Sequence, residues 1–410
     1  MYYSVVQDPA FCNTIHAVRD GLPSHRSEPL GLAPFLSRAI KSGRLVKVAE
    51  KETIAAAARR QGFDLAGVMR AADLASAPDL PFYRSWLAQG YHGQLAYLAG
   101  ERAQIRRDLD RLLPGVRSVI CVAMNYNVEL PYSTALADAT RAWISRYAWG
   151  DDYHQLFREK LEALVSDLRK GFTRPEEFRA RLAVDTSPIL ERALARRTAV
   201  GWMGKNTCLI NQKLGSWLFL GEVLTTLELP RDDPAPDRCG SCTKCIEACP
   251  TGALLGPRVL DSRRCISYWT IEARGAIPEQ MRAGIGRHVF GCDICQDVCP
   301  WNRKALATRD PAFRPRHGLF HPPLEQLAEI SAEQFARMFR NSPIRRARYQ
   351  GFLRNVCVAI GNSGDPRFVP KLQRLAEHSD PVVREHAIWA LDKLDHKDTK
   401  DTKITKNVAL

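Results

Sequence analysis

Eight cysteines in the middle of the chain constrain its fold more than any other feature. Four of them lie in Cys239–Pro250, with the spacing C-x2-C-x2-C-x3-C-P, and three lie in Cys292–Pro300. Cys265 stands alone between these two blocks. The first spacing is that of bacterial ferredoxins, whose thiolates hold [4Fe–4S] clusters. Two clusters in one chain form an electron relay, so this pattern predicts a protein that either carries electrons or uses them.

In two-cluster ferredoxins the last cysteine of a run ligates the other cluster. This rule predicts one set of thiolates made of Cys239, Cys242, Cys245 and Cys299. It predicts a second set, completed by the isolated cysteine, made of Cys249, Cys265, Cys292 and Cys295. Two structural zinc sites are the main alternative, because zinc also takes four thiolates, although it usually uses separated C-x2-C pairs. Disulfides are the weakest alternative, because no charged-then-apolar leader opens the chain and an oxidising compartment is not indicated.

At 410 residues the chain has room for two or three domains. Its hydrophobic content of 45% and charged content of 25% are ordinary for a soluble globular protein. No apolar run is long enough to cross a bilayer, so we expect a cytoplasmic protein without membrane contact. The remaining cysteines share no ligand spacing and are predicted to be small buried hydrophobes: Cys12, Cys121, Cys208 and Cys357.

A formal net charge of +14 and a pI near 9.3 favour a polyanionic partner, although a merely basic protein also fits. Three stretches are rich in arginine, and in the longest Phe339 and Tyr349 lie among the arginines. Arginine forks match phosphate geometry, and aromatic rings can stack on bases, so these stretches predict nucleic-acid contact. Their arginines are Arg192, Arg196, Arg197, Arg263, Arg264, Arg337, Arg340, Arg345, Arg346, Arg348 and Arg354.

The first half of the chain alternates apolar strands with amphipathic helices, which predicts an α/β (α+β) layer domain over 47–230. Residues 1–46 lack a clear period and are interpreted as an extension of uncertain order. The Pro- and Asp-rich segment 230–238 is the predicted boundary of this domain. Strands are predicted at 62–68, 118–124, 181–185 and 217–224, and helices from Glu52 and over 154–170.

A ferredoxin-like domain is predicted over 231–310, followed by a helical domain over 311–395. Helices are expected to begin after turns at Asp365-Pro366 and Asp380-Pro381. Apolar residues repeat there at a spacing of 31 residues, which suggests stacked helix pairs of the HEAT type. The matched residues are Val356, Ala359 and Ile360 with Ala387, Ala390 and Leu391. The Lys- and Thr-rich tail 396–410 is predicted to be disordered.

Asp185 ends the strand predicted at 181–185, just before a helix. In α/β sheets ligands gather beyond the carboxyl ends of strands, and a partly desolvated carboxyl there can donate a proton near neutral pH. Ser187 is interpreted as the N-cap of the following helix and Pro188 as its first residue. Equally, Asp185 could serve only to cap this helix.

Two further segments could line a pocket. Gly201–Thr207 is a glycine-rich turn that carries a cation and an amide, and glycines permit close backbone approach to a cofactor. Ser145–His154 concentrates aromatic and polar residues ahead of a helix. A plain structural turn and a packed helix entry explain these segments equally well. His154 is not expected to bind a metal, because no partner histidine lies at ligand spacing.

Together, these motifs resemble the epoxyqueuosine reductase family. The resemblance covers roughly residues 50–395, and the order and spacing of so many separate motifs make it specific. Its similar stretches are Gly62–Asp64, Arg146–His154, Val184–Pro188, Gly201–Asn206 and the two cysteine blocks with Cys265.

The resemblance implies an enzyme that binds cobalamin between an α/β domain and a domain with two [4Fe–4S] clusters. It implies that the clusters feed electrons to the cobalt. The epoxide of epoxyqueuosine, at the wobble position of tRNA, would be reduced to the cyclopentene of queuosine, with the oxygen lost as water. The family's proton donor falls on Asp185. We expect a monomer that takes electrons from an external donor.

The resemblance also assigns binding residues by position. Arg192 is expected to contact tRNA, and the basic patch of Arg345, Arg346 and Arg348 is expected to do the same. The residues expected around the corrin ring are Tyr147, Trp202, Lys205, Asn206, Ser267 and Asp297.

Three other functions fit parts of the sequence. A different cobalamin iron–sulfur reductase, such as a reductive dehalogenase, usually carries a twin-arginine export signal, which we do not find. A pure electron carrier would not need the large α/β domain with Asp185 at a strand end. An iron–sulfur RNA-binding protein without catalysis would not need the Asp185 carboxyl at all.

Overall fold

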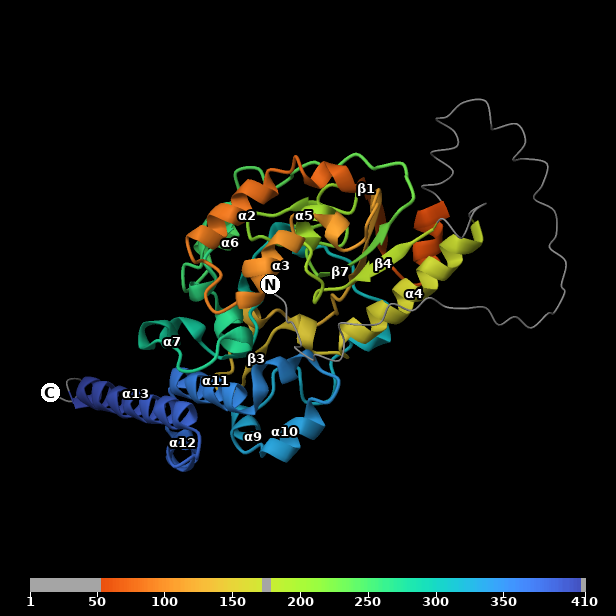
Figure 1. Ribbon diagram of the computed structural model, residues 1–410. Helices are drawn as coiled ribbons and strands as arrows, with labels where there is room; N and C mark the ends of the chain where they lie inside the picture. The colour runs from red at the N-terminus through yellow and green to blue at the C-terminus, as the bar shows by residue number, and fades with distance from the viewer. Residues whose placement is uncertain (1–52, 172–177, 407–410) are drawn as a thin grey trace, which may run out of the picture.

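The computed structural model describes residues 53–171 and 178–406, so the predicted extension 1–46 lies outside the described residues (Figure 1). Residues 53–60 are helical, which agrees with the helix expected from Glu52 onward. In the described part of the chain, no helix combines the length and the apolar character that spanning a membrane would require.

A four-stranded sheet forms the centre of the amino-terminal half. Its order is β1 (Leu65–Arg70), β2 (Ser118–Asn125), β7 (Leu218–Thr225) and β4 (Ala180–Ala183). The four strands predicted from apolar runs are thus confirmed within a few residues. Every pairing in this sheet is antiparallel, so the domain is of the α+β kind. The prediction of a ligand site at Asp185 rests on the rule that ligands gather beyond the carboxyl ends of parallel strands. That rule does not apply in this antiparallel sheet, because an alternation of strands and helices in the sequence does not determine whether the strands run parallel.

Side chains alternate between the two faces of this sheet, as a pleated strand requires. Ile120 and Val122 of β2 face one core, which also takes in α4 (Tyr153–Gly171) and the carboxyl-terminal helices. Val119 and Cys121 face a second core, built on α5 (Glu191–Ala195). The sheet therefore lies between two layers, and the predicted first and third domains share one continuous core.

Apart from the three carboxyl-terminal helices, the remaining described α-helices are short. They are α2 (Asp79–Ala88), α3 (Gly100–Ile105), α6 (Lys244–Glu247), α7 (Glu279–Ile285), α8 (Ile294–Asp297), α9 (Leu324–Ala328) and α10 (Ala332–Met338). Three two-stranded pairs complete the described strands: β3 (Trp143–Ile144) with β10 (His288–Phe290), β5 (Trp202–Met203) with β6 (Leu209–Ile210), and β8 (Leu254–Gly256) with β9 (Val259–Leu260).

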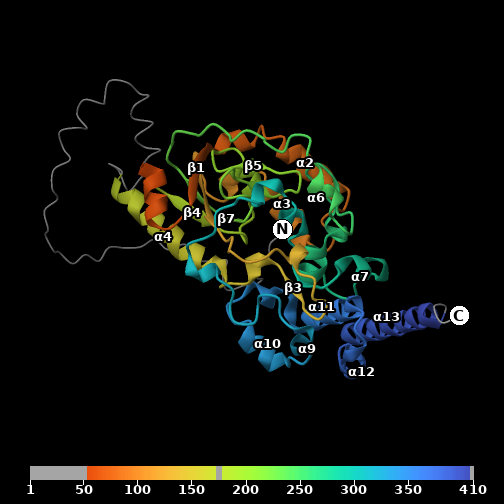
Figure 2. The ribbon, with the colours of Figure 1, turned by 180° about the vertical axis from the view of Figure 1, so that it is seen from behind.

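Three helices form the predicted repeat at one end of the molecule: α11 (Arg348–Ser363), α12 (Val369–Ala376) and α13 (Pro381–Lys406) (Figures 1 and 2). Ala359, Ala387 and Ala390 are fully buried between them, as the 31-residue spacing predicted. Gly361 lets α11 and α13 approach closely, because a Cβ there would meet the Cα of Ala390 at 3.0 Å. The prediction that the tail is disordered from residue 396 is wrong as far as Lys406, because α13 continues to that residue.

Arg354 joins the carboxyl-terminal helices to the cluster region. The arginine-rich stretch predicted that it contacts nucleic acid, but its side chain is not available to phosphate. It is 2% exposed, and its guanidinium donates hydrogen bonds to the carbonyl oxygens of Trp269, Ala273 and Gly275. The adjacent Asn355 donates to the carbonyl oxygens of Thr270 at 2.8 Å and Val289 at 2.9 Å. A buried side chain that donates hydrogen bonds to several buried carbonyl oxygens has a structural role.

Replacing Arg354 with Met should therefore destabilise the protein. The substitution keeps an unbranched side chain but leaves three buried carbonyl oxygens without their donor, which should lower the free energy of unfolding by about 3 kcal/mol. Thermal unfolding of the reconstituted protein would measure this loss. Arg337→Met on the exposed surface of α10 is the matched control, and equal melting temperatures of the two variants would contradict the role given to Arg354.

Candidate active site and cluster region

A cavity of about 530 Å³ lies between the second face of the sheet and the cluster region. Leu218 and Leu220 of β7 form its floor, and Leu260 and Gln296 of the cluster region form part of the opposite wall. Much of its lining is apolar or aromatic, including Trp86, Tyr97, Tyr126, Tyr153 and Phe219. Small-molecule sites are typically concave, mostly apolar and of this size.

Asp185 is one of three acidic residues on the wall of this cavity. It follows β4 by two residues, and its backbone φ of 42° lies in the left-handed region that few residues other than glycine adopt. Its N–H donates to a carboxylate oxygen of Glu191, and Arg102 donates to the carbonyl oxygen of Thr186 at 3.1 Å. Backbone strain of this kind persists where the surroundings fix it, often at functional sites.

The predicted helix start after Asp185 is wrong. The helix α5 begins at Glu191, and Ser187 and Pro188 lie in the loop before it. The physical reason is that the Glu191 side chain accepts a hydrogen bond from the backbone N–H of Asp185, and this bond holds the segment between them as a loop. Asp185 is therefore presented to the cavity by a fixed loop and does not cap the helix.

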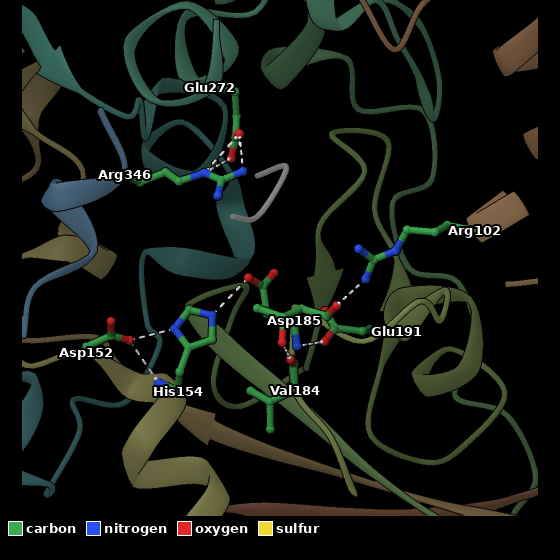
Figure 3. A network of polar contacts seen from close by, with 9 residues as sticks. Arg102, Asp152, His154, Val184, Asp185, Glu191, Glu272 and Arg346 are labelled. Carbon is green, nitrogen blue, oxygen red and sulfur yellow. Dashed lines mark hydrogen bonds and ion pairs between the residues drawn. The ribbon is translucent and has the colours of Figure 1, made fainter. Parts of the chain in front are cut away.

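His154 connects Asp185 to a second carboxylate (Figure 3). Its Nε2 lies 3.0 Å from Oδ2 of Asp185, and its Nδ1 lies 2.6 Å from Oδ1 of Asp152. Burial lowers the pKa of His154, but the hydrogen bonds and charges of Asp152 and Asp185 outweigh burial and raise its pKa to about 10. The imidazole is therefore protonated at neutral pH. The sequence does not indicate this role, because only the fold brings Asp185 to His154, 31 residues away.

Two more acidic side chains, those of the buried Glu191 and Glu222, lie close to Asp185. Burial and the charge of Asp185 together raise the pKa of Glu191 to about 8. Burial also raises the pKa of Glu222 well above its usual range, and Glu191 and Asp185 add to this. Glu222 faces Cys121 and Ala183 within the sheet. The site thus concentrates acidic groups that hold protons near neutral pH.

The eight predicted ligands gather in two neighbouring groups. Burial, together with the nearby Cys299, Cys239 and Cys242, raises the pKa of Cys245 to about 11. Burial likewise raises the pKa of Cys292 well above its usual range, and the nearby Cys265 and Cys249 add to this. The pKa of Cys295 is also raised, by its hydrogen bond with the Cys208 thiol and by burial, and the nearby Cys292 contributes to this increase. Within the described ranges, no group of three or more His, Cys, Asp or Glu side chains converges as it would on a single metal ion.

The other described cysteines are buried, as expected, but one of them also has a place in the site. Cys121, Cys208 and Cys357 are all buried, whereas Cys12 lies outside the described residues. Cys208 lines the cavity, and its thiol is hydrogen-bonded to that of Cys295. The sequence did not single it out, because it lies apart from the two cysteine blocks.

None of the six residues expected around a corrin ring lines the cavity; the wall instead includes Met203, Thr207 and Gln296, which adjoin Trp202, Asn206 and Asp297 in the sequence. Lys205 donates to the carbonyl oxygens of Gly240 and Cys242, at 2.7 and 2.9 Å, and so holds the first cysteine block in place. The other five are also largely enclosed: Tyr147, Trp202, Asn206, Ser267 and Asp297 are all buried.

Asn206 and Asp297 have specific polar partners. The Asn206 amide donates to the carbonyl oxygen of Cys295 at 3.2 Å, and the Asp297 carboxylate accepts from the hydroxyl of Ser133 at 2.9 Å. Burial raises the pKa of Asp297 to about 7, and the charge of Asp293 contributes. The bond of Asn206 and the bond of Asp297 thus both connect the sheet domain to the cluster region.

The basic residues are only partly available to a polyanion. Arg345 and Arg348 are exposed, whereas Arg346 forms an ion pair at 2.8 Å with the buried carboxylate of Glu272 (Figure 3). Arg192 lies on the cavity wall and donates to the carbonyl oxygen of Thr207 at 2.6 Å. The expected base-stacking role of Phe339 is wrong, because its ring is fully buried in the core. An arginine-rich run does not reveal which side chains face inward.

Comparison with known proteins agrees with this arrangement. Residues 238–302 match a family model described as a 4Fe-4S double cluster binding domain, and residues 345–402 match HEAT repeats. Residues 106–186, which end at the loop of Asp185, match a family model described as epoxyqueuosine reductase QueG.

Relatives and solved structures extend the match to most of the chain. An epoxyqueuosine reductase of Xanthomonas campestris pv. campestris is 42% identical over 82% of this chain and 93% of its own length. That of Pseudomonas aeruginosa is 43% identical over 81% of this chain and 91% of its own length. A crystal structure of epoxyqueuosine reductase with an epoxyqueuosine-modified tRNA stem loop has a TM-score of 0.75 and 32% identity, covering 85% of this chain and 90% of that one.

A double [4Fe–4S] domain beside a cavity that carries the Asp185 carboxyl defines an iron–sulfur oxidoreductase, and iron–sulfur clusters are thereby preferred to zinc. The extent of the identity then fixes the family: this chain belongs to the epoxyqueuosine reductases.

Proposed function

We propose that the chain reduces epoxyqueuosine in tRNA to queuosine. The observation that carries this proposal is the position of Asp185, a carboxyl on the wall of a cavity whose other side is the cluster region. The reaction breaks both C–O bonds of the epoxide, forms a carbon–carbon double bond, and releases the oxygen as water. It consumes two electrons and two protons, so it needs an acid and a reductant at the same place.

Asp185 is the acid in this proposal. Negative charge develops on the epoxide oxygen as its bonds break, and a carboxyl beside that oxygen lowers the barrier by giving it a proton. The left-handed backbone at residue 185 and the bond to Glu191 hold the carboxyl toward the cavity.

The cavity also fits a large flat cofactor. Its aromatic and apolar lining would pack against a corrin ring, and among the described residues the buried Nε1 of Trp202 has no hydrogen-bond partner, so it could donate to a cofactor amide. Tyr147, Lys205, Asn206, Ser267 and Asp297 would enclose the same region. When bound, cobalamin would supply a strongly reducing cobalt centre that accepts single electrons from the clusters. An external one-electron donor would supply the clusters, and the protein would act as a monomer.

An anaerobic turnover assay tests the proposal. The reconstituted protein, with cobalamin and a chemical reductant, is incubated with tRNA that carries epoxyqueuosine, and the digested nucleosides are identified by mass spectrometry. Conversion to queuosine that requires cobalamin is the expected result. If clusters and cobalamin are both verified as bound and the epoxide nucleoside is unchanged, the proposed substrate is wrong.

The exposed arginines at the start of α11 and just before it should contribute to tRNA binding. Replacing Arg345 and Arg348 together with Gln should weaken binding about tenfold at physiological salt and lower the slope of log K against log salt by about one to two, because fewer counterions are released. Binding titrations at several salt concentrations measure both effects. Arg346 is left unchanged, because its ion pair with Glu272 would confound the result.

Arg117 and Arg231 provide the matched control, since they are 64% and 55% exposed and lie at the edges of the sheet domain. Replacing them with Gln removes the same total charge. If both double variants lose affinity equally, the effect comes from net charge and not from a contact surface near α11.

A further inference from the structure

The line Asp152–His154–Asp185 leads from the protein surface to the cavity. The side chains of Asp152, His154 and Asp185 are 33%, 23% and 4% exposed, so exposure falls steadily toward the cavity. Figure 3 shows the imidazole between the two carboxylates, with one ring nitrogen directed at each. The two contacts, at 2.6 and 3.0 Å, are short enough for proton transfer along the line.

The start of α4 fixes the orientation of this imidazole. Asp152 accepts the backbone N–H of His154 at 3.1 Å as well as its Nδ1, so one carboxylate sets both the backbone and the ring. Tyr153 stacks on the His154 ring with a centroid distance of 4.3 Å, and its other neighbour is Phe219 at 4.0 Å. The Nε2 of His154 is thereby directed at Asp185 and cannot turn away without breaking these contacts.

The charges around His154 keep it protonated. The balance of burial against the two carboxylates raises its pKa to about 10, and an imidazolium donates through both nitrogens. The other titratable or charged groups that face the line are Glu191, Glu222, Tyr97 and Tyr147 near Asp185, the Glu272–Arg346 ion pair above it, and Arg316 near Asp152. At neutral pH, Asp185 therefore lies next to a group that holds one transferable proton.

The stoichiometry of the reaction needs such a group. One epoxide oxygen leaves as water only after it has received two protons, whereas a carboxyl carries one. A tRNA nucleoside seated in the cavity would cover Asp185 on the solvent side, so the second proton must come from the protein side. In the described structure, the nitrogen 3.0 Å behind Asp185 is Nε2 of His154.

We propose that His154 is a positioning residue that supplies the second proton of each turnover to Asp185; this inference rests on the proposed function. Asp185 gives its proton to the epoxide oxygen and becomes a carboxylate. His154 then transfers its Nε2 proton to that carboxylate and becomes neutral, and Asp185 passes this proton to the same oxygen. Two electrons from the external donor complete the balance. Both groups are reprotonated from solvent when the product leaves, and Asp152 keeps the Nδ1 proton in place.

Single-turnover rates of His154→Gln and Asp152→Asn across a range of pH test this inference. In the natural protein the rate should fall at alkaline pH, where His154 loses its proton, because its pKa is raised above the ordinary value for histidine. His154→Gln can still hydrogen-bond to Asp185 but has no proton to give, so its rate should be about 100-fold lower at neutral pH and lack this descending limb. Asp152→Asn removes one of the carboxylates that raise the His154 pKa, so the limb should move to lower pH.

Chemical rescue separates proton supply from packing. Added imidazole should partly restore the rate of His154→Ala, whereas pyrazole, which has a similar shape but is not protonated near neutral pH, should not. Affinity for the tRNA and the absorption spectrum of bound cobalamin should be unchanged in all three variants. Equal rescue by both compounds, or a wild-type pH profile in His154→Gln, would overturn the inference. If the natural protein itself leaves the epoxide unreduced, the proposed function fails instead.

Discussion

Replacing Asp185 with Asn should stop the reduction while the protein keeps its fold and its ligands. Asparagine has the same shape as aspartate and tolerates the left-handed backbone at this position, where φ is 42°. The backbone N–H can still donate to Glu191. Because the amide cannot give a proton to the epoxide oxygen, the single-turnover rate should fall by about 10²–10⁴-fold. Mass spectrometry of the tRNA nucleosides measures this rate.

The control for this experiment is Asp167→Asn on α4, which removes a carboxylate of the same size near the surface. That variant should convert the epoxide at the wild-type rate. Iron content, cobalamin binding and tRNA affinity should be the same in both variants, which separates loss of the acid from loss of the site. A fully active Asp185→Asn variant would show that another group supplies the proton, and Glu191 would be the first to examine.

The cluster region was the most predictable part of the molecule. The C-x2-C-x2-C-x3-C-P spacing determines which sulfurs can reach one metal centre, so local sequence is enough to predict a double-cluster domain. The strands and the helical repeat were predictable for a related reason. Apolar residues that recur with a period of two, or at a spacing of 31 residues, predict which side chains are buried, and this prediction does not require knowing which segment packs against them.

The parts that could not be predicted depend on contacts between distant segments. The start of α5 is delayed to Glu191 because that side chain is engaged with Asp185, and a cap-like Ser187 cannot reveal this. Arg354 and Arg345 look alike in sequence, yet the first is buried among carbonyl groups and the second is exposed. The pairing of His154 with Asp185 spans 31 residues and two elements.

Replacing Cys265 with Ala should remove one cluster and leave the other. The Cys265 side chain lies beside Cys249 and Cys292, and a short helical turn, Ser262–Arg264, directly precedes it. Alanine offers no thiolate, so a four-cysteine site is left with three ligands. The iron content should fall from about eight to about four atoms per chain, and turnover should be lost, because the path of electrons to the cavity is interrupted. Iron and sulfide analysis of anaerobically purified protein measures the change.

Cys357→Ala is the matched control, because Cys357 is fully buried in α11 with its thiol pKa raised by burial alone among apolar neighbours. It should keep about eight irons and full activity. A Cys265→Ala variant that also keeps about eight irons would show that another thiol completes the second site, and Cys208, hydrogen-bonded to Cys295, is the nearest candidate. A loss of all iron would instead mean that the two clusters assemble cooperatively. Partial loss with full activity would contradict the view that both clusters lie on the path of electrons to the cavity.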